Sequence, residues 1–343
     1  MAPMFSPNAP AMSTPLASAA PATRTQLHRL LDAGRAHAAT YRGALSNHLP
    51  MAQQALLELG ATAERMQAWT EAHEVHLEPR CGARPAAILL ARDLGRPDAD
   101  ASWRAHFAQR IAVLGPSAAL REGLGLLMPG AGAIAFHGLI RTAHAVLAAH
   151  EGELAAGLAH WASHFMPLPS APGSSAVPLG AGVAALLQLP PPTSSAGGLI
   201  AERMQAWAAA PGFADAVAQL PATPDTLREL ALLAARTYAA TGNFTVLHLL
   251  TASHAMTVLE PWWPEADLPR GFVVAAAASL LASRAQPAWV LDQPPCRPWP
   301  TLLSAACAQD DPHVIKLVHA AWRLGRRWPD PAWRRAAERA VPV

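Results

Sequence analysis

The chain of 343 residues contains 15 histidines and 25 arginines but a single lysine, Lys316. Lys316 follows His313 by three residues in the apolar segment DDPHVIKLVHAAW. Arginine replaces lysine readily where any cation serves, but only lysine can lose its proton at ordinary pH. A lysine retained within an apolar helix therefore indicates a site that needs the amine itself. The simpler alternative is a lysine kept by chance, whose charged end reaches solvent along its own stem.

Five histidines lie in otherwise apolar segments with helical character. They are His48, His137, His248, His254 and His313. A single histidine in such a setting is commonly a core residue with one hydrogen-bond partner. Five of them would each need a buried partner, and convergence on one metal ion would satisfy several rings at once. We therefore predict that these rings form a metal site.

The spacing of these residues limits how they can share one centre. His248 and His254 are six residues apart, which on a straight helix is about 120° of rotation and about 9 Å of rise. They can reach one metal only from its two sides or through a π-bulge. His313 and Lys316 are three residues apart and share a helix face.

No carboxylate accompanies the histidines on their apolar faces, so an iron site of two histidines and one carboxylate is not expected. A buried lysine offers a substitute ligand, because desolvation lowers its pKa. The neutral amine of Lys316 can add carbon dioxide and become a carbamate, which is an anionic oxygen ligand. Neutral imidazoles and one carbamate suit a redox-active divalent metal such as Fe(II).

Helices must position these side chains, and helices are what the sequence predicts. Alanine and leucine dominate, and apolar residues recur at spacings of three and four. The predicted helices cover residues 23–45, 50–60, 61–76, 101–114, 117–128, 132–149, 151–165, 199–209, 224–241, 244–259, 268–283, 301–308, 312–326 and 331–340. Proline-rich segments at 167–174, 189–198 and 285–300 predict loops. The expected fold class is all-α, a single large irregular helical bundle over residues 23–343 after a disordered N-terminal tail at 1–22.

Composition excludes several classes of function. The formal net charge is +2, and no basic stripe is interleaved with aromatic residues, so no nucleic-acid partner is expected. No uninterrupted apolar run is long enough to span a bilayer, so no membrane partner is expected. Three cysteines without CxxC spacing favour a reducing, cytoplasmic location. The sequence leaves the oligomeric state open.

Four segments, taken in this order, resemble the questin oxidase-like family, and the similarity extends from about residue 24 to the C-terminus. The segments are SNHLPMAQQALLELGA at 46–61, AFHGLIRTAHA at 135–145, GNFTVLHLLTASHA at 242–255 and DDPHVIKLVHA at 310–320. The resemblance implies a bacterial member of a family whose fungal members are associated with oxidative opening of anthraquinone and xanthone-type rings. Members are described either as NADPH-using Baeyer–Villiger-type oxidases or as non-haem iron oxygenases with histidine ligands and a carboxylated lysine.

The resemblance also implies a ligand set. It assigns the metal ligands to His48, His137, His248, His254 and Lys316, with His313 outside the ligand sphere or as an alternative ligand. The sequence has no GxGxxG turn after a strand, so a Rossmann cofactor site is not supported and NADPH rests on the resemblance alone.

We predict an oxygen-dependent oxidoreductase that acts on a small aromatic or quinone-like substrate at an Fe(II) site, with O2 as co-substrate and ring opening as the expected class of reaction. Arg141, one turn after His137, and Asn243 are the predicted catalytic residues, Arg141 to stabilise a phenolate or enolate oxygen. One alternative is a metal- or ligand-binding helical protein without turnover. Another is a scaffold whose buried histidines are hydrogen-bonded to the backbone, and a third is an NADPH-dependent Baeyer–Villiger-type oxidase without a bound metal.

Overall fold

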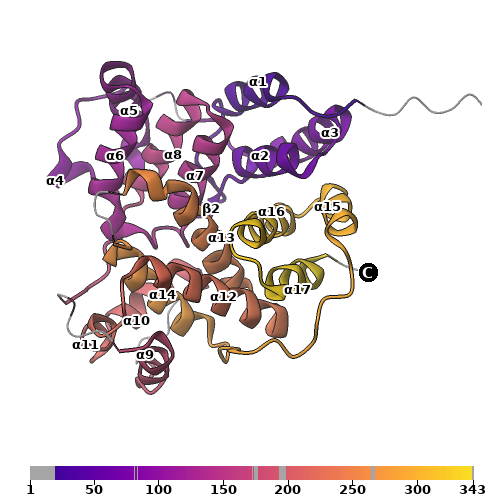
Figure 1. Cartoon of the computed structure of the whole chain (residues 1–343). Coiled ribbons are helices and arrows are strands. Elements are labelled where there is room, and N and C mark those ends of the chain that lie inside the picture. The colour runs from indigo at the N-terminus through magenta and orange to yellow at the C-terminus, as the bar shows by residue number, and fades with distance from the viewer. Residues whose placement is uncertain are drawn as a thin grey trace, which may run out of the picture.

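The computed structural model describes residues 20–80, 82, 84–171, 173, 177–192, 198–263 and 267–341. Within these residues the chain is helical apart from one two-stranded hairpin, which confirms the predicted all-α class (Figure 1). The predicted tail at 1–22 lies outside the described residues except for its last three. The α-helices are α1 (Arg24–Gly34), α2 (Leu49–Leu59), α3 (Ala63–Glu74), α4 (Leu90–Asp93), α5 (Asp100–Leu114), α6 (Pro116–Leu127), α7 (His137–Ala148), α8 (Glu151–Ser163), α9 (Leu179–Leu186), α10 (Ile200–Ala208), α11 (Phe213–Ala218), α12 (Pro224–Thr241), α13 (Phe244–Leu259), α14 (Arg270–Ser283), α15 (Trp299–Cys307), α16 (Pro312–Arg327) and α17 (Pro331–Ala340). Three short 3-10 helices are η1 (Pro97–Ala99), η2 (Met128–Gly130) and η3 (Glu260–Trp262), and the strands are β1 (Thr40–Tyr41) and β2 (Leu45–Ser46).

Four helices form a closed ring of contacts within this bundle. α2 packs against α7 and α16, and α13 packs against the same two helices. Figure 1 shows α16, in yellow, beside α13 although the two are distant in sequence. The remaining helices surround this ring, with α12 and α17 on one side and α5, α6 and α8 on another.

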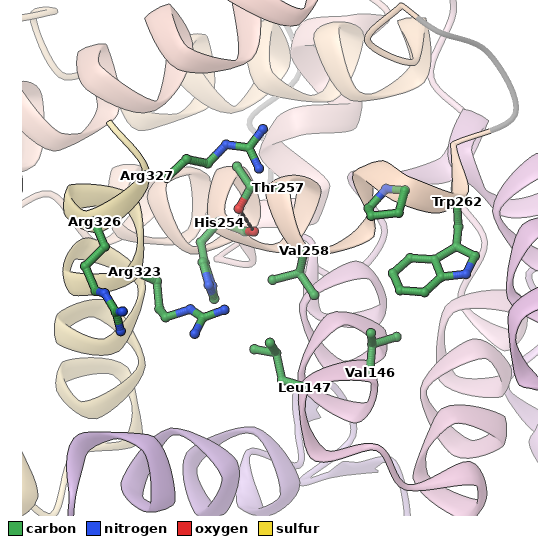
Figure 2. Close-up of a pocket in the computed structure, with 10 residues that line it drawn as sticks. Val146, Leu147, His254, Thr257, Val258, Trp262, Arg323, Arg326 and Arg327 are labelled. Carbon is green, nitrogen blue, oxygen red and sulfur yellow. Dashed lines mark hydrogen bonds between the residues drawn. The ribbon is translucent and has the colours of Figure 1, made fainter. Parts of the chain in front are cut away.

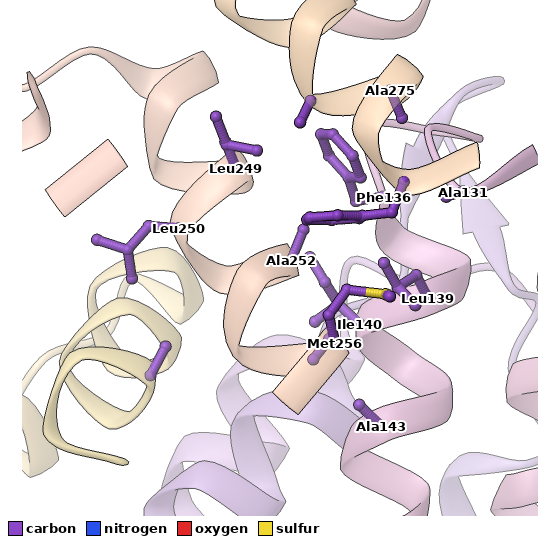
Figure 3. Close-up of a cluster of buried hydrophobic side chains, with 14 of the residues drawn as sticks. Ala131, Phe136, Leu139, Ile140, Ala143, Leu249, Leu250, Ala252, Met256 and Ala275 are labelled. Carbon is purple, nitrogen blue, oxygen red and sulfur yellow. The ribbon is translucent and has the colours of Figure 1, made fainter. Parts of the chain in front are cut away.

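Apolar side chains hold the ring together. On α7, Leu139, Ile140 and Ala143 are buried beside Ala252 and Met256 of α13 (Figure 3). Burying one leucine side chain contributes about 1.5–3 kcal/mol, so this interface is a main source of stability. The relative positions of α7 and α13 are therefore well fixed.

α7 also approaches α8 closely through small residues. A Cβ atom added at Gly138 would lie 2.6 Å from the Cα of Trp161, and one added at Gly157 would lie 3.0 Å from the Cα of Thr142. Contacts this short leave no room for a side chain. Gly138 follows His137 directly, so the close packing fixes the helix exactly where a predicted site residue begins it.

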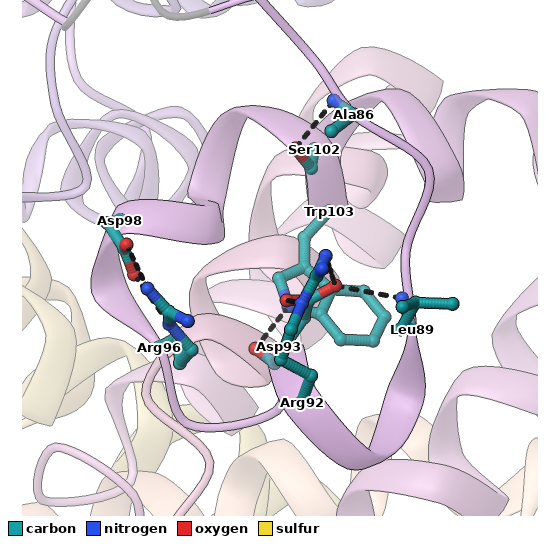
Figure 4. Close-up of polar contacts among 8 residues, drawn as sticks. All are labelled: Ala86, Leu89, Arg92, Asp93, Arg96, Asp98, Ser102 and Trp103. Atoms are coloured by element: carbon teal, nitrogen blue, oxygen red, sulfur yellow. Dashed lines mark hydrogen bonds and ion pairs between the residues drawn. The ribbon is translucent and has the colours of Figure 1, made fainter.

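A polar network anchors the chain that leads into α5 (Figure 4). The Asp93 carboxylate accepts hydrogen bonds from the Leu89 amide at 2.8 Å and from the Arg92 guanidinium at 2.6 Å. The buried Trp103 indole donates to the Asp93 carbonyl at 3.0 Å. α5 then packs on α8, which supports α7 from the outside.

Two predicted helix boundaries are wrong. The helix expected over 23–45 ends at Gly34, and the chain then forms the hairpin of β1 and β2, where Thr40 pairs with Ser46. Arg42 and Gly43 adopt positive φ values of 48° and 80° at its turn, which a helix cannot contain. The helix expected over 132–149 begins only at His137, because residues 134–136 also have positive φ.

Short helices were missed where glycine and proline are frequent. α9 and α11 lie in stretches that the sequence assigned to no helix. The loop expected at 285–300 is found up to Pro298, and α15 begins at Trp299. Among the described residues, none of the helices combines the length and apolar character needed to cross a membrane.

Candidate metal centre

Four of the predicted histidines meet inside the ring of α2, α7, α13 and α16. Ligand nitrogens of His48, His137 and His313 all lie within 4.8 Å of one another. The Nε2 atoms of His48 and His137 are 3.0 Å apart. His248 completes the group, because its ring centroid is 5.0 Å from that of His137 and 5.4 Å from that of His313. We call His48, His137, His248 and His313 the first histidine layer.

Each residue of the first histidine layer stands near the start of its helix. His48 is the N-cap of α2, His137 is the first residue of α7 and His313 is the second residue of α16, while His248 lies in the second turn of α13. The positive ends of several helix dipoles therefore face this layer. Such ends favour a nearby negative charge by about 0.3–1 kcal/mol each at exposed sites. The layer is suited to anionic ligands.

The turn before α7 orients His137. Ile134, Ala135 and Phe136 have φ values of 46°, 53° and 68°, a left-handed run that is costly for residues with a side chain. This backbone places the Ile134 carbonyl 2.5 Å from Nδ1 of His137. A carbonyl only accepts, so Nδ1 carries the proton and the lone pair of His137 lies on Nε2. Unusual backbone geometry thus directs a ligand atom toward the centre of the layer.

Two other rings are held in the same manner. His248 donates from Nδ1 to the Phe244 carbonyl at 2.8 Å, and Nδ1 of His313 lies 2.9 Å from Oδ1 of Asp311. Ligating histidines usually donate their second N–H to an oxygen in this way, which fixes the ring and leaves Nε2 for the metal. The pKa of Asp311 is lowered, first by its hydrogen bond to His313, so its carboxylate remains charged.

Lys316 lies one helical turn after His313, with only 1 % of its surface exposed. Its amine has no hydrogen-bond or ion-pair partner among the residues that the structure describes. Burial lowers the pKa of Lys316 to about 7, although the charge of Asp311 opposes the shift. Burial also lowers the pKa of all four imidazoles of the first histidine layer, and the charge of Lys316 lowers it further. The whole group therefore favours neutral nitrogen donors.

A pocket of about 460 Å³ opens onto the first histidine layer, and all four of its rings line that pocket. Phe244 contributes an aromatic wall, with ring centroids 4.7 Å from His248 and 4.7 Å from His313. Leu199, Ile200 and Ile134 add apolar surface. A concave apolar pocket with convergent polar groups is typical of a small-molecule site.

His254 does not reach this layer. α13 is α-helical through both His248 and His254, without the π-bulge that would bring them together. The His254 ring lies instead 5.1 Å from His319 and 6.3 Å from His144, whose rings are 5.5 Å apart. We call His144, His254 and His319 the second histidine layer.

The sequence analysis did not single out His319, which is fully buried. The spacing of the histidines in the sequence could have identified His319, because it follows His313 by six residues, as His254 follows His248. Two carboxylates nevertheless lie beside histidines from outside the apolar helix faces. A carboxylate oxygen of Glu58, which belongs to α2, lies 3.0 Å from Nε2 of His319. Asp311, the N-cap of α16, is hydrogen-bonded to Nδ1 of His313. Neither acid shares an apolar helix face with its histidine, so periodicity could not reveal the pairing.

The two predicted catalytic residues are engaged in structural contacts. Arg141 is buried and forms a two-point ion pair with Glu153, with N–O distances of 2.5 and 3.1 Å. Asn243 is the N-cap of α13, where its Oδ1 accepts from the amides of Thr245 and Val246. Neither residue lines the pocket at the first histidine layer. The structure therefore places both in supporting positions.

No curated protein matches the chain significantly. The family model described as questin oxidase-like matches residues 45–321, which contain both histidine layers and Lys316. The family name is that of an oxidase, an enzyme acting on a small substrate. The chain belongs to the questin oxidase-like family of oxidoreductases.

Proposed function

We propose that the first histidine layer and Lys316 hold a divalent iron ion and that the protein oxidises a quinone-like aromatic substrate with dioxygen. The proposed substrate class is anthraquinone-like, as the family name suggests, and the proposed outcome is ring opening. One observation carries the proposal: four imidazoles gather in one layer, and one of them, His313, lies a helical turn before a buried lysine whose amine has no partner among the described residues.

The donor set fits such an ion. Two Nε2 atoms 3.0 Å apart are spaced as neighbouring ligands are around a metal with bonds of about 2.1 Å at right angles. Two further rings carry Nδ1 hydrogen bonds that leave their Nε2 atoms unprotonated. Neutral imidazoles suit iron, and one anionic oxygen would balance part of its charge.

Lys316 can supply that oxygen. Its pKa of about 7 leaves a large neutral fraction at physiological pH. The amine nitrogen forms a bond to the carbon of carbon dioxide and releases one proton, which leaves an anionic carbamate. The facing helix N-termini stabilise this negative charge. Arginine could not replace Lys316 in the step, because its guanidinium stays protonated.

The chain's own residues would bind the substrate and exclude water. Phe244 offers a ring face to an aromatic substrate, and Leu199 and Ile200 cover the pocket with apolar surface. A phenolate oxygen entering beside His48 would face helix N-termini, which favour its charge. A bound Fe(II) supplies the electrons that make dioxygen reactive toward such a ring.

The direct test is reconstitution without oxygen. Metal-free protein is supplied with Fe(II) and bicarbonate, iron is quantified, and oxygen uptake is followed with a panel of hydroxylated anthraquinones, with and without NADPH. We expect oxygen uptake that requires iron. The Lys316→Arg variant keeps the positive charge but forms no carbamate, so it should lose both iron and oxygen uptake.

The alternatives give different results. Iron bound without oxygen uptake across the panel favours a metal-binding protein without turnover. Oxygen uptake that needs NADPH and is unaffected by metal removal favours an oxidase without a bound metal. Unchanged iron content and activity in Lys316→Arg would contradict the proposed role of the lysine.

A further inference from the structure

The second histidine layer repeats the first about two turns farther along the same four helices. α7, α13 and α16 each contribute one imidazole, from His144, His254 and His319. α2 contributes Gln54 and Glu58 in place of a fourth histidine. All three imidazoles are at most 4 % exposed. The function proposed above makes no use of this layer.

A chain of hydrogen bonds determines which nitrogens in the layer carry protons. The Glu58 carboxylate accepts from Nε2 of Gln54 at 2.8 Å, so Oε1 of Gln54 is the acceptor for Nδ1 of His144 at 2.6 Å. The proton of neutral His144 therefore lies on Nδ1, and its lone pair lies on Nε2. Glu58 also accepts from Nε2 of His319 at 3.0 Å, which leaves the lone pair of neutral His319 on Nδ1. An oxygen that holds the second nitrogen is the arrangement found behind metal-ligating histidines.

Two nitrogens of the layer are buried without a partner. They are Nδ1 of His319 and Nε2 of His254. A buried polar atom without a partner destabilises the folded protein, so such atoms point to a ligand that pairs with them. Burial, followed by the neighbouring His319, lowers the pKa of His254 well below its ordinary value, so its ring is neutral at physiological pH. Nδ1 of His319 can only accept, because the proton of its neutral ring lies on Nε2, so it requires a Lewis acid or a proton donor.

We propose that the second histidine layer is a second metal site, which takes a divalent transition-metal ion such as Zn²⁺ on His144, His254 and His319, with Glu58 and Gln54 holding the rings. The ring centroids are 5.1, 5.5 and 6.3 Å apart. Imidazoles bound at about 2.0–2.1 Å place their centroids roughly 5–6 Å apart, so the two separations that involve His319 suit a common ion, whereas that between His144 and His254 is wider. The nitrogens are less tightly gathered than in the first histidine layer, the only described group with three ligand atoms within 4.8 Å, so binding requires small rotations of the rings.

This site is separate from the first. Six residues of helix correspond to a rise of about 9 Å, whereas paired catalytic metals lie about 3.5–4 Å apart. Lys316 lies between the layers in sequence, three residues from both His313 and His319, and its charge lowers the pKa of His144 after burial and the neighbouring imidazoles. Two single ions are therefore expected, not one bridged pair.

An entry path reaches the second histidine layer from its own pocket. His254 lines a pocket of about 530 Å³ together with Arg323, Arg326 and Arg327 (Figure 2). Figure 2 shows the His254 ring next to the Arg323 guanidinium, with Val258 and Trp262 farther along the apolar wall. Three histidine ligands leave a fourth position open, which water or a small anion from this basic pocket can fill.

The test uses Co²⁺ as a spectroscopic probe, with the full-length protein freed of metal by chelation. We expect two Co²⁺ ions per chain, one of which is lost in His319→Gln and in His254→Gln. His313→Gln should lose the other ion and retain the one in the second histidine layer. The visible absorption of the two ions should differ, because three imidazoles favour four-coordination and the first layer offers more ligands. His28→Gln serves as the control, because His28 and His150 form a ring pair outside both layers.

A third variant of the second histidine layer keeps the test valid if His319→Gln or His254→Gln fails to fold. Glu58→Gln removes only the carboxylate behind His319, and we expect about 10–100-fold weaker Co²⁺ binding at the second site. Co²⁺ stoichiometry and affinity that are unchanged in folded His319→Gln, His254→Gln and Glu58→Gln would overturn the proposal. Failure of the proposed iron site looks different, because Lys316→Arg and His313→Gln would then leave the Co²⁺ stoichiometry unaltered while the second-layer variants still reduce it.

Discussion

The two histidine layers share four helices but differ in what surrounds them. The first layer lies at helix N-termini, near the buried Lys316 and beside a largely apolar pocket. The second layer lies about two turns farther along these helices. His319 of this layer is hydrogen-bonded to Glu58, and His254 lines a pocket rich in arginine. Position along one set of helices therefore changes the chemistry that similar imidazoles can support.

The difference concerns the source of negative charge. In the second histidine layer Glu58 already supplies a carboxylate, and Gln54 connects it to His144. In the first layer the nearest acid, Asp311, is hydrogen-bonded to the outer nitrogen of His313. We propose that Lys316, after reaction with carbon dioxide, presents an anionic oxygen to the first layer from within the helix ring. The following predictions test this division.

The largest expected effect compares two histidines on α7. His137→Ala removes a ligand of the first layer, and we expect oxidation to fall by about 10³-fold or more, since losing a ligand removes the metal chemistry. His144→Ala, seven residues later, should retain iron in the first layer and most of the oxidation. Steady-state oxygen uptake with iron quantification measures both. Equal losses of oxidation in the two folded variants would show that the layers do not act separately.

The next prediction concerns the stability of the metal-free protein. The pKa of Lys316 is about 7 in the folded chain against an ordinary 10.5, so between these pH values the unfolded chain binds more protons. Stability should therefore rise as pH increases from 7 toward 10.5, and the cost of the buried amine should be complete below pH 7. Lys316→Met should raise the free energy of unfolding by about 4 kcal/mol near pH 7, because it removes an amine whose pKa falls from 10.5 to about 7 on folding.

Denaturant unfolding at several pH values, with carbon dioxide and metal excluded, measures that gain. It should shrink toward pH 10, whereas His319→Gln should show no such trend in this range. A gain from Lys316→Met that stays constant between pH 7 and 10 would contradict the burial of a protonatable amine.

A smaller effect separates the two pockets. Phe244→Ala removes the aromatic wall beside His248 and His313, and we expect KM for the aromatic substrate to rise about 10-fold, or about 1.4 kcal/mol of lost stacking and burial. Iron content should not change. Trp262→Ala alters the arginine-rich pocket and should leave this KM unaltered. If instead Trp262→Ala raises KM and Phe244→Ala does not, the substrate binds at the other pocket.

The smallest effect should be common to both layers. Asn243→Ala removes the N-cap of α13, the helix that carries His248 and His254, and should cost about 0.5–2 kcal/mol of stability. Thermal unfolding measures the loss, and kcat in the folded protein should change little. A large fall in kcat without a change in stability would restore Asn243 as a catalytic residue.

Much of the scaffold could be predicted from the sequence. The apolar residues that recur at spacings of three and four around Ile140 and Leu250 indicate helices, and the apolar settings of His137 and His248 indicate buried imidazoles. Burial of Lys316 also follows from its apolar helix. These features depend on local periodicity, which a single sequence contains.

The rest depends on contacts between distant segments. The pairing of Glu58 with His319 spans 261 residues, and that of Gln54 with His144 spans 90, so neither leaves a local pattern. Arg141 looked like a catalytic cation because its partner, Glu153, belongs to another helix. The left-handed run at Ile134–Phe136 lies in the segment AGAIAF, whose alanines favour a helix.

The most direct test of the central claim is ¹³C NMR of the protein incubated with ¹³C-labelled bicarbonate and a diamagnetic divalent metal such as Zn²⁺. If Lys316 is a carbamate, one protein-bound carbonyl signal should appear in the wild type, persist in His319→Gln and be absent in Lys316→Arg. Absence of this signal in metal-loaded wild-type protein, or its persistence in Lys316→Arg, would contradict the account.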